Sequence, residues 1–186
     1  MKNELACGET NSAAYKRRME LKGSIMKTIG YSLCKPLASQ MHLIGGNRLA
    51  VSFTPDEYIV MIQLPEYKVG TAECLSLLSK AVIVKPDDVC TSSLVIAGLR
   101  TAEEAKNICE YLKTDFVKYL IGQTPLEGGL SEENFAHVPM LGFSERWDDA
   151  KLNEFYSFTE EEKDVIKDVD SLIKEVAGAI KKEVVQ

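Results

Sequence analysis

The chain of 186 residues is long enough for one hydrophobic core, or for one domain with an accessory segment. Apolar residues make up 45% and charged residues 27%, as in an ordinary soluble globular protein, and no apolar run approaches the length of a membrane span. The net charge of −6 is unevenly spread, since residues 1–36 carry +4 and residues 37–186 carry −10. A DNA-binding protein usually has a basic footprint, so the acidic body weighs against simple DNA binding.

The cysteines and histidines show no pattern of a disulfide framework or a metal site. The five cysteines are widely spaced, with no Cys-x-x-Cys pair. Neither His42 nor His137 has a second Cys, His or carboxylate at ligand spacing. Charges interrupt the first thirty residues, where a signal peptide would need an apolar core. We therefore expect a cytoplasmic protein without a metal or a cofactor.

Residues 1–39 are predicted to form a basic helical arm, with its helix over residues 13–29. Two interpretations of this helix stay open: it docks on the body as a solvated helix, or it contacts phosphate groups or a partner. In the second case the candidate nucleic-acid-contacting residues are Lys16, Arg17, Arg18 and Lys22.

Residues 40–186 are predicted to form one α+β domain. Residues 48–53, 58–64, 81–84 and 93–97 are rich in β-branched and aromatic residues and are bounded by turn residues, which predicts strands. A short helix or a turn is expected over residues 71–79. Because Pro139 cannot donate a ladder hydrogen bond, residues 136–141 are expected to be an edge strand or an extended segment.

The strongest helix signal covers residues 101–122. Thr101 and Glu104 form a capping box at its start, and no Gly or Pro interrupts the helix before Gly122. Apolar residues then recur at helical spacing: Ala105, Ile108, Cys109, Leu112, Phe116, Tyr119 and Leu120. This pattern predicts one long central helix, with Cys109 as a small buried apolar residue.

Two further helices are expected after that central helix. Residues 148–155 form a short helix, and a second capping box of Thr159 and Glu162 opens a terminal helix through Ile180. The predicted architecture is a small, mostly antiparallel sheet, with the long central helix and the C-terminal helix packed on it.

Catalytic motifs are absent from the sequence. It contains neither a GxxxxGK[ST] phosphate loop nor a GxSxG nucleophile motif. Asp87 and Asp88 follow Pro86 and are explained by a turn, and the acidic run at residues 160–162 is explained by the dipole of a helix N-terminus. We predict that the chain is not an enzyme.

The order and spacing of motifs over residues 81–168 resemble a known family. The segments are VCTSSLVIAGLRTAEEAKNICEYLKTDFVKYLIGQT at residues 89–124 and NFAHVPMLGFSERWDDAKLNEFYSFTEEEKDVI at residues 134–166. They resemble the C-terminal target-recognition region of fused restriction–modification adenine methyltransferases. The resemblance implies a recognition domain that contacts DNA.

The chain departs from the family pattern in informative ways. The methyltransferase motifs are absent, so no methyl transfer is expected. Asp115 stands where the family helix usually has Lys, Gly142 where Asp is usual, and Asn153 where an aromatic residue is common. Replacing a cation by an anion lowers the affinity for phosphate groups. The scaffold is thus expected to be kept while its contacts have changed.

Three hypotheses about function follow from these features. The favoured one is a non-catalytic inhibitor encoded by a mobile element, which binds a nuclease of the CRISPR or restriction type, or its nucleic-acid complex, and blocks DNA engagement. The second is a stand-alone module that recognises duplex DNA. The third is a decayed fragment without activity. No membrane partner is expected, and the oligomeric state stays open.

The candidate partner-binding residues lie on the outer face of the central helix and at the single tryptophan: Glu103, Glu110, Lys113, Asp115, Lys118 and Trp147. Trp147 is expected to be mainly structural, packing near Phe143 and the start of the 148–155 helix, with a role as an interface anchor as the alternative.

Overall fold

The computed structural model describes residues 13–30, 34–44, 57–65, 71–84, 93–124, 126 and 129–169. Along the described chain the elements are α1 (Ala13–Gly30), η2 (Leu37–Gln40), β1 (Met41–Ile44), β2 (Tyr58–Gln63), α2 (Thr71–Leu78), β3 (Val82–Val84), β4 (Ser93–Leu99), α3 (Ala102–Leu112), α4 (Asp115–Ile121), η3 (Glu132–Phe135), α5 (Asp149–Phe155) and α6 (Glu160–Lys167). The predicted α+β class is confirmed.

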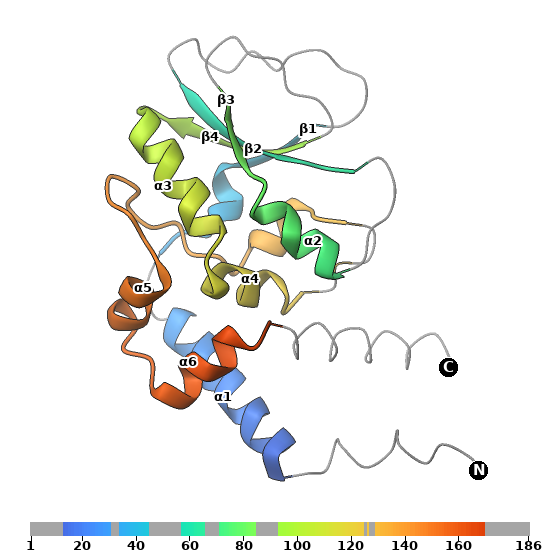
Figure 1. The fold of residues 1–186 in the computed structure, drawn as a ribbon, viewed down its shortest axis with the longest axis vertical. Helices are drawn as coiled ribbons and strands as arrows, with labels where there is room; N and C mark the ends of the chain where they lie inside the picture. Colours follow the sequence, from blue (N-terminus) through green and yellow to red (C-terminus); the bar gives the residue numbers. More distant parts are fainter. Residues whose placement is uncertain are drawn as a thin grey trace, which may run out of the picture.

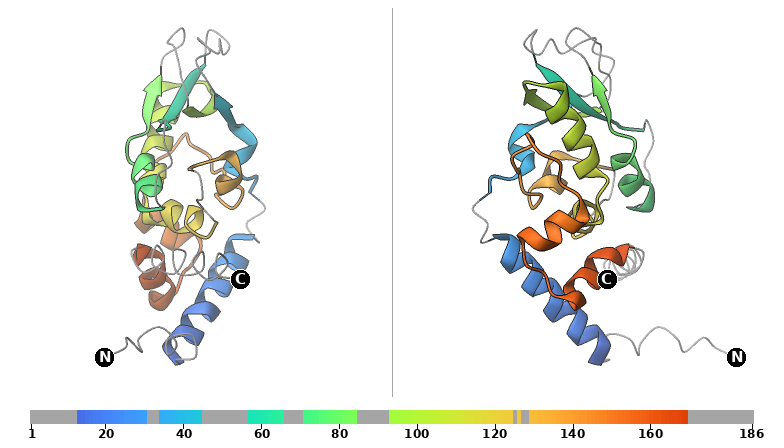
Figure 2. Two further views of the ribbon diagram at one scale, coloured as in Figure 1. Left: turned by 90° about the vertical axis from the view of Figure 1, so that its right-hand side faces the viewer. Right: turned by 60° about the vertical axis from the view of Figure 1, so that its left-hand side comes forward.

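The sheet is antiparallel, with strand order β1-β4-β2-β3 (Figures 1 and 2). Strands β2, β3 and β4 match the sequence prediction, whereas β1 was missed. Of the four residues of β1 only Met41 and Ile44 are buried, so the strand lacks the alternation that a periodicity search detects. The predicted strand at residues 48–53 lies outside the described residues.

The main hydrophobic core lies between the sheet and the helices that cover one of its faces. Helix α3 packs on β2, β3 and β4, and α2 packs on β2. A smaller cluster of Ile44, Ile59, Val84 and Val95 lies on the other face of the sheet. The two clusters follow from the alternation of side chains along each strand.

The long helix predicted over residues 101–122 is in fact two helices, α3 and α4. The capping box of Thr101 and Glu104 is present, and the predicted apolar stripe is buried. The chain leaves helical geometry at Thr114, where ψ is 150°. The Thr114 hydroxyl donates to the Tyr111 carbonyl and accepts from the Val117 N–H, so it ends one helix and caps the next.

A carboxylate from α5 fixes this helix break. The backbone N–H groups of Asp115 and Phe116 donate to the two carboxylate oxygens of Asp149, at 3.2 and 3.1 Å. The first N–H groups of a helix have no partner within it, so the carboxylate supplies what α4 lacks. The junction of α3 and α4 is therefore held from a point more than thirty residues further along the chain.

Helix α6 has its principal contacts with α1 and α4, so the expected packing of the C-terminal helix on the sheet is corrected. Its capping box of Thr159 and Glu162 is present as predicted. Val165 and Ile166 are buried, and Glu162 accepts a hydrogen bond of 2.6 Å from Ser24 of α1. Its predicted continuation through Ile180 lies outside the described residues beyond Val169.

The arm predicted over residues 1–39 shares the main core wherever it is described. Ile25, Ile29 and Leu37 belong to the same hydrophobic cluster as the residues of α3 and α4. Just after α1, Leu37 N–H donates to the Val138 carbonyl and Met140 N–H donates to the Lys35 carbonyl. Residues 136–138 form a turn and a bend, and Pro139 makes one isolated bridge with Pro36, so the predicted edge strand or extended segment is corrected for residues 136–138. The domain division at residue 39 stays a prediction.

Burial in the centre of α3 gives a direct test of the packing. Leu112 is completely buried, and burial raises the pKa of the nearby Cys109 thiol to about 11. Replacing Leu112 by Ala should lower the free energy of unfolding by about 2–5 kcal/mol, because the change leaves a cavity. Urea unfolding measures this loss. The exposed Lys106→Ala on the same helix is the control. If both variants lose an equally small amount of unfolding free energy, the described packing of Leu112 is wrong.

Candidate functional site

The outer face of α3 carries two of the predicted partner-binding residues as an ion pair. Lys113 Nζ lies 2.7 Å from a Glu110 carboxylate oxygen, and this hydrogen bond is the main cause of the lowered pKa of Glu110. The positive charges of Arg146 and Lys106 lower the same pKa. Three cations therefore act electrostatically on Glu110, of which Lys113 is in direct contact. We call these four residues the α3 face.

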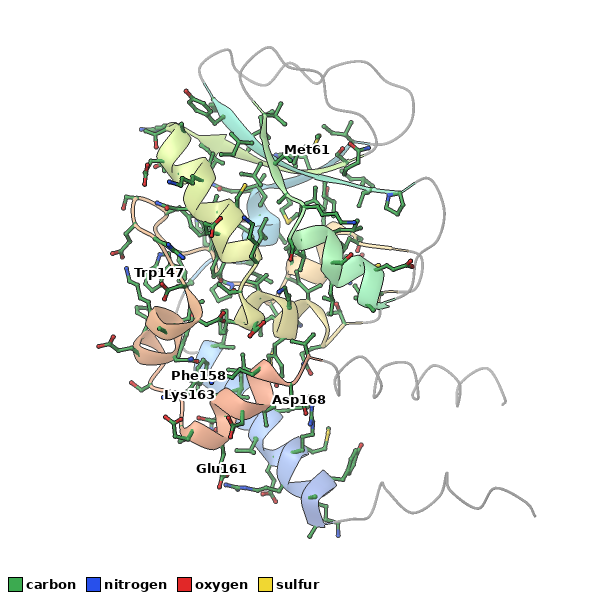
Figure 3. The ribbon with its side chains drawn as sticks, in the orientation of Figure 1. Met61, Trp147, Phe158, Glu161, Lys163 and Asp168 are labelled. Atoms are coloured by element: carbon green, nitrogen blue, oxygen red, sulfur yellow. The ribbon has the colours of Figure 1, made fainter. Side chains whose placement is uncertain are left out.

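Trp147 is packed into the structure, as predicted. Its indole is 6% exposed, and Nε1 donates to the Gly142 carbonyl at 2.9 Å. The ammonium of Lys151 lies 4.3 Å from the ring centroid and is also paired with Glu145. The ring of Phe155 meets the indole edge-on, at a centroid distance of 5.2 Å. We call Trp147, Lys151 and Phe155 the aromatic corner. Trp147 is labelled in Figure 3.

Phe155 is the solvent-facing aromatic residue of this corner, and sequence reasoning missed it. It is 52% exposed, although Leu152 and Tyr156 beside it are buried. The sequence does contain a signal for this exposure. Phe155 is the last residue of a seven-residue helix, and it does not lie on the apolar side defined by Leu152 and Tyr156. Exposed aromatic residues next to packed ones are common anchors of protein interfaces.

Asp115 and Lys118 form a second group that turns away from the α3 face. Their side chains are half-buried and 3.9 Å apart. Loss of hydration on burial, together with the negative charge of Asp149, raises the pKa of Asp115 above its usual value. Lys118 and Lys167 oppose this effect. The Asp115 side chain is 42% exposed, so the expected exposed face holds in part, while its backbone N–H is held by Asp149 of α5.

The structure thus separates the predicted partner-binding residues. Glu110 and Lys113 lie on the α3 face. Arg146, which also belongs to this face, directly precedes Trp147 in the sequence. Glu103 is exposed in the first turn of α3. Asp115 and Lys118 lie beyond the helix break, half-buried on α4.

The arginines of the predicted basic cluster on α1 are paired with α6. The Arg17 guanidinium donates to Glu161 at 2.6 and 3.2 Å, and this carboxylate is the main cause of the raised pKa of Arg17. Arg18 donates to the Asp168 carboxylate at 2.8 Å. Figure 3 shows Glu161 on α6 and Asp168 directly after α6, beside α1. Lys16 is exposed and Lys22 is half-buried on the same helix.

Two hollows border α1. A groove of about 470 Å³ lies between α1 and α6; it is lined by Ala14, Tyr15, Arg17, Arg18, Leu21, Glu161, Asp164 and Val165. A smaller pocket of about 140 Å³, near the end of α1, includes Cys34 and His137 in its lining. Within the described ranges no three His, Cys, Asp or Glu residues are grouped to hold a metal ion.

Comparisons with protein-family models, with curated proteins and with solved structures find no match to this chain. The resemblance to methyltransferase recognition regions therefore stays an expectation. Among the described helices, none has both the length and the apolar character needed to cross a membrane.

The raised pKa of Asp115 predicts a pH-dependent gain from its neutral isostere. When the pKa of a carboxyl group is higher in the folded than in the unfolded protein, its ionisation makes the folded protein less stable as the pH rises from the lower to the higher pKa. Asp115→Asn should therefore raise the melting temperature at pH 7. The gain should disappear near pH 3, about one unit below the ordinary pKa, where the group is protonated in both states. Glu103→Gln, on an exposed turn, is the control. A lower melting temperature for Asp115→Asn at pH 7 would contradict the repulsion from Asp149.

The packing of Trp147 predicts its fluorescence. This single tryptophan is buried, so the native protein should emit at shorter wavelength than free indole, and the emission should shift to longer wavelength on unfolding. Emission spectra in buffer and in denaturant measure this shift. Native emission like that of exposed indole would contradict the structure.

Proposed function

We propose that the protein is a non-catalytic binding protein of the defence and counter-defence class. In this proposal it binds a nuclease of the CRISPR or restriction type, or the complex of that nuclease with nucleic acid, and blocks DNA engagement. The observation that carries the proposal is the pairing of the predicted cations. Arg17, Arg18, Lys113 and Lys118 each lie within ion-pair distance of a carboxylate of the chain.

Cations that are already paired with carboxylates contribute less to DNA binding. A protein gains salt-dependent affinity for DNA when its cations replace the counterions of phosphate groups. A cation that already has a carboxylate partner must exchange that partner for the phosphate. Surface ion pairs are weak, so the exchange is not forbidden, but each one offsets part of the gain.

The end of the molecule formed by α5 and α6 fits a basic protein partner. Glu154 and Asp164 are exposed there, and Phe155 stands beside Glu154. Glu160 and Glu161 are exposed too, but Lys163 and Arg17 pair with them, so they add less to the acidic surface. Opposite potentials steer two proteins together, and a desolvated aromatic residue supplies an anchor at the centre of an interface. In the proposed complex these carboxylates face the channel of the nuclease that normally holds nucleic acid.

The α3 face favours a second candidate function, that of a DNA target-recognition module. There Lys113 pairs with Glu110, and the charges of Arg146 and Lys106 also lower the pKa of Glu110. These three cations are the basic residues that a DNA site on this face would use, with Glu103 and Glu110 opposing them. This candidate predicts that DNA binding depends on the α3 face and not on the aromatic corner.

Matched charge reversals separate the two candidates. The inhibitor predicts that Phe155→Ala combined with Glu154→Lys weakens inhibition by about tenfold or more, equivalent to about 1.4 kcal/mol. Lys106→Glu combined with Lys113→Glu is the control and should leave inhibition unchanged. The nuclease is first identified by co-purification with the tagged chain from its native host, and DNA cleavage is then measured with each variant.

A gel shift with random duplex DNA, at about 50 and 200 mM salt, completes the test. Strong, salt-sensitive binding that the α3-face reversals abolish would establish the recognition module instead. The inhibitor proposal is rejected if the isolated chain leaves cleavage by the co-purified nuclease unchanged.

A further inference from the structure

The groove of about 470 Å³ between α1 and α6 lies at both ends of the described chain. Ala14, a lining residue on α1, directly follows Ala13, where the description of this helix begins. Asp168, directly after α6, accepts a hydrogen bond of 2.8 Å from Arg18 of the same groove. Apolar atoms make up most of the groove surface, as is typical of a site that holds an apolar segment. The chain therefore leaves the described region beside an apolar groove.

The residues that follow α6 carry the pattern of an amphipathic helix. Residues 170–186 lie outside the described residues, and their sequence is DSLIKEVAGAIKKEVVQ. Counted from Val169, apolar residues recur at helical spacing: Leu172, Ile173, Val176 and Ile180. All five lie on one side of an α-helix. A single short helix is only marginally stable in water, so this apolar stripe indicates packing against another apolar surface.

We propose that residues 169–180 form a helix that packs into the groove between α1 and α6. The chain turns at Asp168, where φ is −83° and ψ is 59°, so this helix does not continue α6 in a straight line. Val169 is half-buried and packs against the main core, which fixes the start of the helix. As helices, residues 169–180 span about 18 Å and residues 14–21 of α1 span about 12 Å. The segment is thus long enough to cover the groove.

The charge of the segment suits this position. Residues 170–186 carry three Lys and three acidic residues, so they bring no net charge to an acidic molecule. Lys174 and Lys181 follow one border of the apolar stripe, and the α6 wall of the groove offers them the exposed carboxylates of Glu161 and Asp164. A second copy of the chain, with its net charge of −6, would instead meet a repelling surface.

The other segment that adjoins the groove fits it less well. Residues 1–12, which precede α1, have the sequence MKNELACGETNS, with Leu5 as the single branched apolar residue and no helical stripe. The groove is therefore assigned to the C-terminal segment. Because Arg17 and Arg18 line the groove, the packed helix covers part of the predicted nucleic-acid-contacting cluster.

Hydrogen exchange on the full chain, followed by mass spectrometry, tests whether the segment is packed. The backbone N–H groups of residues 172–180 should exchange about tenfold or more slowly than in the unfolded chain, because a packed helix keeps its hydrogen bonds. Val176→Gln should remove this protection and lower the melting temperature by about 2 °C or more. Glu175→Gln, at the neighbouring position outside the apolar stripe, is the matched control and should change neither quantity.

A second pair of variants tests whether the groove is the place of packing. Ala14 is exposed and lines the groove, so Ala14→Arg fills it from the α1 side without disturbing the core. This variant should speed the exchange of residues 172–180 by about tenfold or more. Ala13→Arg changes an exposed residue outside the lining and is the control. Circular dichroism establishes that both variants are folded.

Three results would overturn the proposal. The first is exchange of residues 172–180 in the wild-type chain as fast as in the unfolded chain. The second is equal protection in Ala14→Arg and Ala13→Arg, which would mean that the segment packs elsewhere. The third is protection that falls on dilution, which would place the segment against a second copy. The test does not depend on the proposed function, because it uses neither a nuclease nor DNA.

Discussion

The hydrogen bonds from the start of α4 to the carboxylate of Asp149 are the contact on which the arrangement of the helices depends. They satisfy the N–H groups of Asp115 and Phe116, which the break at Thr114 leaves without partners within the helix. A buried helix end without such partners would be costly, so the break and the position of α5 are fixed together. The cost of this arrangement is the approach of two carboxylates, Asp115 and Asp149.

Aromatic packing extends the same junction toward α5 and α6. Phe116, the second residue of α4, stacks on Tyr156 at 5.3 Å, and Tyr156 stacks on Phe158 at 5.4 Å. From α3, the buried groups of Asn107 and Tyr111 donate to the carbonyls of Phe143 and Pro139. These buried hydrogen bonds hold the loop that leads to Trp147. The exposure of Phe155 therefore results from a rigid framework beneath it, a property suited to an interface anchor.

The sequence predicts what local chemistry decides. The capping boxes at Thr101 and Thr159 were found because their partners lie three residues away. The break at Thr114 was missed because Leu112 and Phe116 keep helical spacing across it, while the second capping group, Asp149, is distant in sequence. The pairing of Arg17 with Glu161, 144 residues apart, was hidden for the same reason. Sequence patterns identified the charged residues of the candidate site but not the partners that neutralise them.

Charge pairing changes what the basic arm can do. Seen along the sequence, Lys16 to Lys22 form a positive segment that contrasts with an acidic body. In the fold, Glu161 of α6 and Asp168 directly after it pair with Arg17 and Arg18, and Glu162 of α6 accepts a hydrogen bond from Ser24. Much of the positive charge of the arm thus serves to join the beginning of the described chain to its end. The acidic excess that remains gathers on the exposed sides of α5 and α6, while the paired sheet strands at the other end are almost free of charge. This separation places the carboxylates that a basic partner would meet at the end of the molecule opposite the sheet.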